Sequence, residues 1–272
     1  MRFSITTDMF NYSFNPGLEE KLNLFKEYGF EYIHWCDDWD NDTLYSADEI
    51  SFFKKQVNNA GILCQDVHGT STTQYRIDSL DYESRKGYKA LLENRVQLCS
   101  ALGGDCVVVH PPRTEDGKLG FKLESAIEML EDIQKLCREL GIRLAVENCY
   151  KDDMFFLEGF LDAFEPEFLG ICFDSGHANI HGNVDEVFNH RERLLATHLH
   201  DNKGDLDSHQ PPFLGTVNWG NVINLIRTSG YRKPLNLEDT YYKGVYKGSM
   251  SEFLTISHAA ADKLLQLMAP ES

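Results

Sequence analysis

The chain has 272 residues, 42% hydrophobic and 25% charged, which is close to the globular average and excludes disordered, collagen-like and coiled-coil proteins. Its 43 acidic and 26 basic side chains give a formal net charge of -17, which opposes binding to a phosphate backbone. We therefore expect no nucleic acid among its partners.

The location of the protein follows from what the chain lacks. No apolar run approaches the roughly 18 residues of a transmembrane helix, and the first residues do not have the basic, apolar, small-residue order of a signal peptide. The seven cysteines are an odd number without a C-x-x-C pair, which favours buried free thiols over a disulfide framework or a cysteine nucleophile. We expect a cytoplasmic protein that does not bind membranes.

Short apolar runs alternate with amphipathic segments along the whole chain. The runs cover residues 2–7, 32–36, 62–69, 106–112, 143–149, 169–177, 195–202 and 234–239, which makes eight candidate strands. Between them, apolar residues recur at helical spacing. One such set precedes Gly141 and another precedes Gly103: Ala126, Leu130, Ile133, Cys137 and Leu140, and Leu92, Val96, Cys99 and Leu102.

This alternation predicts the fold. Strands that alternate with helices pair in parallel through right-handed crossovers, and eight such units in about 250 residues fit a closed (β/α)8 TIM barrel. We expect one α/β domain over residues 1–272. An open doubly wound sheet is the alternative, but no G-x-G-x-x-G opens a helix.

Acidic and imidazole side chains stand where a barrel places its active site, at the C-terminal ends of the strands. They are His68, His110, Glu147, Asp174, His177, His198, His200 and Glu238, and the loop after the seventh strand adds Asp207 and His209. A single histidine at a strand end is usually a hydrogen-bonded core residue. Their coincidence on six consecutive strands indicates a metal centre, because converging carboxylates repel without a cation and this ligand set suits Zn, Mn or Fe.

Several segments resemble the xylose isomerase-like TIM barrels, the superfamily of sugar phosphate isomerases/epimerases and endonuclease IV. They are DVHG (66–69), VVVHPP (107–112), AVEN (145–148), CFDSGHAN (172–179), THLHDN (197–202), DSH (207–209), GTVNW (215–219) and LNLED (235–239). The resemblance spans the third to the eighth strand. It implies one to three divalent ions, Zn or Mn.

The resemblance also assigns ligands. It implies a first metal at Glu147, Asp174, His198 and Glu238, a second at His68 and His110 with Glu147 bridging, and a third at His177, Asp207 and His209. The family pattern puts the ligand three residues before the acid and so selects His198. His200 remains the alternative ligand, or else contacts substrate.

Other residues are candidates for substrate binding. Arg113 and Lys203 could meet a sugar hydroxyl or phosphate, although solvated surface charges are the competing interpretation. Trp35 could form an apolar wall against a sugar, as could Phe10, Tyr12, Trp39 and Trp219, although barrel packing explains most of them. The sequence does not settle which way His34 faces, and we interpret His181, His190 and His258 as structural.

We predict a metal-dependent sugar or sugar phosphate isomerase or epimerase. Such an enzyme moves a proton beside a carbonyl through an enediolate, with Glu147 and Glu238 as the catalytic acid/base pair. The alternatives are an endonuclease IV-like multinuclear zinc phosphoesterase, which the acidic loops disfavour, and a sugar-binding barrel without activity. The sugar, its phosphorylation, the metal and the oligomeric state, a homo-oligomer included, stay open.

Overall fold

A computed structural model of the protein describes residues 2–10, 16–72, 74–112, 119–150, 153–241 and 246–269. Its strands form one sheet in the order β7-β6-β5-β4-β3-β2-β1-β8. They are β1 (Phe3–Thr6), β2 (Tyr32–Trp35), β3 (Leu63–His68), β4 (Cys106–Val109), β5 (Arg143–Glu147), β6 (Leu169–Asp174), β7 (Leu194–His198) and β8 (Leu235–Leu237). Each neighbouring pair is parallel.

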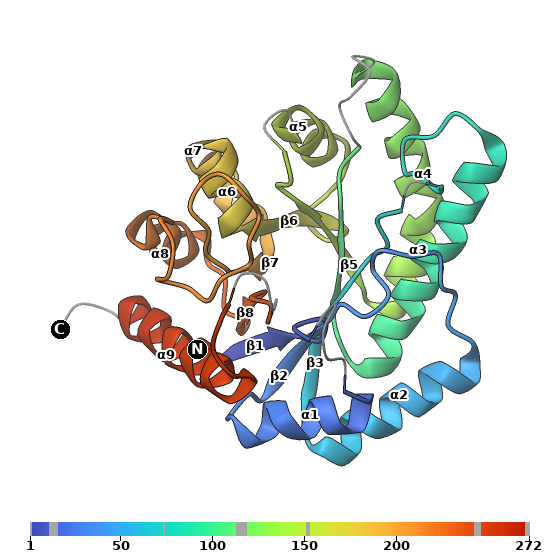
Figure 1. Ribbon diagram of the computed structural model, residues 1–272. Helices are drawn as coiled ribbons and strands as arrows, with labels where there is room; N and C mark the ends of the chain where they lie inside the picture. The colour runs from blue at the N-terminus through green and yellow to red at the C-terminus, as the bar shows by residue number, and fades with distance from the viewer. Residues whose placement is uncertain are drawn as a thin grey trace.

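Helices follow the strands and surround them (Figure 1). They are α1 (Leu18–Glu27), α2 (Ala47–Ala60), α3 (Tyr82–Leu102), α4 (Leu119–Leu140), α5 (Asp153–Ala163), α6 (Ser175–His181), α7 (Val184–Asn189), the 3-10 helix η1 (Arg191–Arg193), α8 (Trp219–Ser229) and α9 (Met250–Met268).

The sheet closes between β7 and β8 just beyond the end of β7. The amide of Leu199 donates to the carbonyl of Asn236 (2.9 Å), and the amide of Glu238 donates to the carbonyl of Leu199 (3.1 Å). The result is a nearly closed (β/α)8 TIM barrel, as predicted, with all eight expected strands in place. Closure brings the ends of β7 and β8 together, and with them His198 and Glu238.

Each of the eight strands ends before its predicted apolar run does, and two of them show the physical reason. Within the run 169–177 the strand ends at Asp174. The Asp174 carboxylate accepts the amide hydrogen of His177 (2.6 Å) and so caps helix α6, which begins at the next residue. The run 106–112 ends at Val109, since Pro111 and Pro112 have no amide hydrogen for a ladder. In both cases the residues after the strand lie at the C-terminal end of the barrel, where a barrel places its active site.

The predicted helix faces are buried. On α4, the side chains of Ala126, Leu130, Ile133 and Cys137 are fully buried, while Leu140 at the end of the helix is 36% exposed. Gly141 then has a φ of +70°, a conformation that glycine adopts without strain and that ends the helix.

The strands divide the apolar residues between two cores. The main core lies between strands and helices and includes Val107, Leu144, Ile171 and Phe173. A separate small cluster comprises Cys106, Val108, Ala145, Cys172, Leu195 and Ala196. Because side chains alternate along a strand, Ala145, Cys172 and Ala196 lie on the same face as Glu147, Asp174 and His198, two residues further on. These small side chains form the floor below the functional residues.

Candidate metal centre

Four of the predicted ligands converge at the C-terminal end of the barrel. Glu147, Asp174 and His198 are the last residues of β5, β6 and β7, and Glu238 directly follows β8. Each is buried, and one ligand atom from each lies within 4.8 Å of the others. We refer to these four residues as the quartet.

His198 lies between the two glutamates of the quartet. Its Nδ1 atom is 3.4 Å from Oε2 of Glu147 and 3.2 Å from Oε1 of Glu238. Neither contact is a hydrogen bond: both ring nitrogens of His198 and Oε2 of Glu147 are buried without a hydrogen-bond partner among the described residues. A buried polar atom without a partner is costly, and a cation among these atoms would satisfy them. The donor set, two glutamates, an aspartate and a histidine, therefore fits a divalent ion.

A second set of donors faces the same glutamate. Nε2 of His68 is 3.6 Å and Nε2 of His110 is 3.3 Å from Oε2 of Glu147. These histidines come from the end of β3 and from the residue after β4. Glu147 thus lies between these two histidines and the other residues of the quartet. A carboxylate that bridges two metal ions would have to lie in this position.

A third set gathers on Asp207. Its Oδ2 is 3.2 Å from Nε2 of His177 and 3.0 Å from Nε2 of His209. His209 Nδ1 is 2.7 Å from the carbonyl oxygen of Glu238, which orients the ring. His177 also reaches Glu147, with 3.1 Å between Nδ1 and Oε1. All nine residues for which the sequence predicts a ligand role therefore lie in one connected group.

His200, the alternative ligand, contacts Asp174 of the quartet. Its Nε2 is 3.1 Å from Oδ2 of Asp174, and its ring stacks on His209 with 3.9 Å between centroids. It also belongs to a donor group with His209 and Glu238. The ring packs so closely on Gly176 that a Cβ atom there would overlap it. His200 therefore fixes the direction of the Asp174 carboxylate.

The charges of the centre depend on one another. Burial alone would raise the pKa of Glu147, but His198 and His110 lower it well below its usual range. Burial also opposes ionisation of Glu238, and His198 again lowers its pKa. Burial lowers the pKa of His209, but the adjacent Asp207 carboxylate raises it to about 10. The carboxylates are thus charged at neutral pH and require positive charge close by.

Two cavities open beside the centre. One, of about 170 Å³, is lined by ligands of all three sets together with Trp39, Cys149 and Tyr150. The other, of about 320 Å³, is lined by Trp35, Tyr45 and several aspartates. Both cavities share Asp8, Cys36 and Trp39, so they are adjacent.

Of the predicted substrate residues, Trp39 lines both cavities, whereas His200, Trp35 and Lys203 do not line the smaller one. Trp35 packs against Phe53 (4.8 Å between ring centroids) and lines only the larger cavity of the two. Lys203 is exposed and lines neither of them. Arg113 and Tyr12 lie outside the described residues. Sequence reasoning left out Asp8 and Cys149 and left His34 undecided, although Asp8 stands two residues beyond the end of β1, on the inward-facing register.

Comparison with known proteins places the chain in a family. The sequence profile of the xylose isomerase-like TIM barrel matches residues 22–267. The chain belongs to this family. The chain is also similar to the uncharacterised protein y4fM of Sinorhizobium fredii, with 28% identity over 94% of this chain and 91% of that protein.

Solved structures of xylose isomerase-like barrels share the fold. A D-tagatose 3-epimerase-like protein matches with a TM-score of 0.77 and 20% identity over 98% of both chains. The IOLI protein with a bound zinc atom matches with a TM-score of 0.77 and 14% identity over 100% of both chains. Among the described residues, no helix is both long and apolar enough to cross a membrane.

Proposed function

We propose that the protein is a sugar isomerase or epimerase that depends on a divalent metal and uses Glu147 and Glu238 for proton transfer. The observation that carries this proposal is the position of His198 Nδ1 between the two glutamates, 3.4 Å and 3.2 Å away, inside a buried four-residue donor set. The structural neighbours include an epimerase-like protein and a zinc-binding one, which supports both parts of the proposal.

The quartet would hold the ion, zinc or manganese. Bound there, a divalent cation supplies Lewis-acid polarisation of the substrate's carbonyl and hydroxyl oxygens. His200 keeps the Asp174 carboxylate aimed at the centre through the 3.1 Å contact. The two further sets would take additional ions, so that these three sets together would hold one to three ions.

The two glutamates would move the proton. In the metal-free protein, burial opposes ionisation of both carboxylates, but positive charge on His198 lowers the pKa of each. A divalent cation held by the quartet would favour the ionised carboxylates in the same way. They approach the centre from β5 and from the end of β8, which lie apart in the barrel. One ionised carboxylate can take the proton from carbon. The other can return a proton from another direction once it has itself taken one from solvent.

The cavities favour a small, uncharged polar substrate over a polyanion. In the two cavities at the centre, Lys21 is the only lysine or arginine among the described lining residues, and its Nζ is paired with Asp37 Oδ1 at 2.7 Å. Asp8, Asp38 and Asp40 add negative charge. A sugar that binds here is recognised by carboxylates and by the Trp39 ring. The assigned contacts of His200, Trp35, Lys203 and Arg113 with a sugar remain predictions.

A second candidate is a multinuclear zinc phosphoesterase of the endonuclease IV kind. It is favoured by the three connected donor sets, because hydrolysis of that type uses cations held about 3.5–4 Å apart. Binding of duplex DNA with an abasic site, measured by fluorescence titration at physiological salt, distinguishes this candidate from the proposed isomerase or epimerase. We expect no binding, since the formal charge is -17.

Isotope labelling tests the proposed reaction. The metal-loaded protein is incubated in deuterated water with a panel of ketoses, their phosphates and inososes. We expect deuterium on the carbon beside the carbonyl of the true substrate, even where net conversion is small. Absence of deuterium across the panel, together with cleavage of a phosphodiester and oxygen uptake from labelled water, would instead establish the hydrolase.

A further inference from the structure

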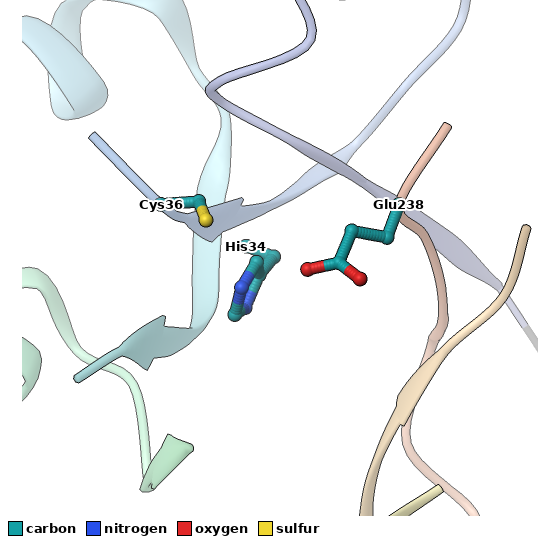
Figure 2. A group of neighbouring side chains, drawn as sticks. All are labelled: His34, Cys36 and Glu238. Carbon is teal, nitrogen blue, oxygen red and sulfur yellow. The ribbon is translucent and has the colours of Figure 1, made fainter. Parts of the chain in front are cut away.

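A further group of buried donors includes one residue of the quartet (Figure 2). His34 of β2, Cys36 just after β2 and Glu238 each offer a ligand atom, and these atoms lie within 4.8 Å of one another. All three residues are buried. In Figure 2 the Glu238 carboxylate points toward the His34 ring, and the Cys36 sulfur lies near the same ring. Neither His34 nor Cys36 belongs to the three ligand sets described above.

The hydrogen bonds of His34 leave one nitrogen free for a ligand. Its Nδ1 is 2.8 Å from Oδ1 of Asp66, and a carboxylate accepts, so Nδ1 carries the hydrogen. The other oxygen of Asp66 accepts from Gln65 Nε2 (3.1 Å). Nε2 of His34 then holds a lone pair, and it is fully buried without a hydrogen-bond partner in the described part of the chain. Proteins commonly orient a metal-bound histidine by this carboxylate contact.

The donor chemistry points to zinc. Imidazole nitrogen, thiolate sulfur and carboxylate oxygen are the three zinc ligand types in proteins, whereas thiolate is a poor ligand for manganese. Cys36 lines both cavities, so an ion can enter and a water molecule can fill a fourth position. On binding, the Cys36 thiol releases its proton to solvent.

We propose that His34, Cys36 and Glu238 form an additional zinc site that shares Glu238 with the quartet. Asp66 is its positioning residue, since it acts on the ion only through His34. The proposal concerns binding alone, so it holds whichever reaction the centre catalyses.

Cobalt(II) titration of the metal-free, full-length chain tests the site, because cobalt bound to thiolate has a charge-transfer absorption that cobalt bound to nitrogen and oxygen lacks. We expect this absorption in the wild type. Cys36→Ser should lose the absorption and one equivalent of tightly bound cobalt, while the ion at the quartet remains. The matched control Cys137→Ser, which removes a buried thiol on α4, should keep both.

A second variant leaves the sulfur in place. In His34→Gln the charge-transfer absorption should require at least about 10-fold more cobalt, because one ligand of the thiolate-bound ion is gone. Circular dichroism confirms that each variant is folded. The site is refuted if the wild type has no thiolate absorption. It is also refuted if the absorption survives in Cys36→Ser and disappears in Cys149→Ser, since Cys149 lies with His110 and Glu147.

Discussion

The interior of the barrel has two halves of different chemistry. On β4 to β7, the inward positions below the ligands are small and apolar, as at Val108, Ala145, Cys172 and Ala196. On β8, β1, β2 and β3, the inward positions are polar and form hydrogen-bonded pairs. The Ser4 hydroxyl donates to Asn236 Oδ1 (2.6 Å), and His34 is paired with Asp66 (2.8 Å).

The two halves therefore have different roles. The apolar half carries most of the candidate metal ligands, and the polar half is held together by its own hydrogen bonds. In the apolar half, Glu147, Asp174 and His198 stand above small side chains. Oε2 of Glu147 and the ring nitrogens of His198 have no hydrogen-bond partner among the described residues, so Oε2 and the one imidazole nitrogen with a lone pair are left for an ion.

The polar half satisfies many of its groups within itself and contributes Glu238 and His68 to the candidate centre. Substitution of the candidate ligands Glu147, Asp174 and His198 should therefore affect metal binding first. Substitution of a hydrogen-bonded pair in the polar half, such as Ser4 with Asn236, should affect stability first.

Removal of a charged ligand should have the largest effect. Glu147→Gln and Asp174→Asn should each abolish activity and weaken metal binding by more than about 100-fold, because changes in outer-shell residues alone cost about 10–100-fold. Isothermal titration of the metal-free variants measures the loss.

The control for this prediction is Cys172→Ala, directly below Asp174. It removes a buried sulfur and should cost about 1 kcal/mol of unfolding free energy while the metal stays bound. Equal metal loss in all three variants would mean that the substitutions act on folding rather than on coordination.

A methyl group at Gly176 should disturb the centre without removing a ligand. Its Cβ would overlap the His200 ring, which contacts Asp174 Oδ2 at 3.1 Å. Gly176→Ala should lower activity by about 10- to 100-fold, since a small misplacement has effects of that size. The matched variant Gly120→Ala on α4 has no atom within 4 Å of the new Cβ and should keep full activity. Steady-state kinetics of the two variants compares them, and equal activities would show that His200 is free to move.

Asp153, after β5, should make stability depend on pH. Burial raises its pKa to about 7, although the amides of Cys149 and Tyr150 donate to it and oppose the rise. Because the folded state holds this proton more tightly than the unfolded state, the unfolding free energy should fall as pH rises from about 4 to about 7. Asp153→Asn should remove this contribution, at most about 4 kcal/mol, since one pKa unit corresponds to about 1.4 kcal/mol.

Urea unfolding of the metal-free wild type and Asp153→Asn, at about pH 5 and about pH 8, measures this contribution. The variant should gain stability relative to the wild type at the higher pH. A pH dependence that is the same in both proteins would rule Asp153 out as its source.

A substitution in the polar half should affect stability alone. Ser4→Ala removes the 2.6 Å hydrogen bond to buried Asn236 and should cost about 1–3 kcal/mol of unfolding free energy, with metal affinity unchanged. Thermal unfolding and metal titration of this one variant test both statements. A loss of metal affinity would show that the two halves are not separable.

The sequence predicts most of the fold and where the candidate ligands lie in it. Eight apolar runs identify the strands, and the rule that active sites lie at strand C-termini selects residues such as Glu147 and Asp174. What it does not predict is the face of β2. His34, with Ile33 and Trp35 beside it, gives no clear alternation, although His34 and Trp35 cannot both point inward. In the structure His34 contacts Asp66 and Trp35 packs against Phe53, and only distances in three dimensions reveal that His198 lies between two glutamates.

Elemental analysis of the purified protein, after expression in metal-supplemented medium, tests the central claim most directly. The quartet should hold at least one zinc or manganese ion per chain. The two further sets allow up to three, and the proposed site at His34, Cys36 and Glu238 allows one more zinc ion. Dialysis against a chelator should remove these ions, and added zinc or manganese should restore them. A chain that is folded by circular dichroism but contains no transition metal, before or after such addition, would contradict the account of this site.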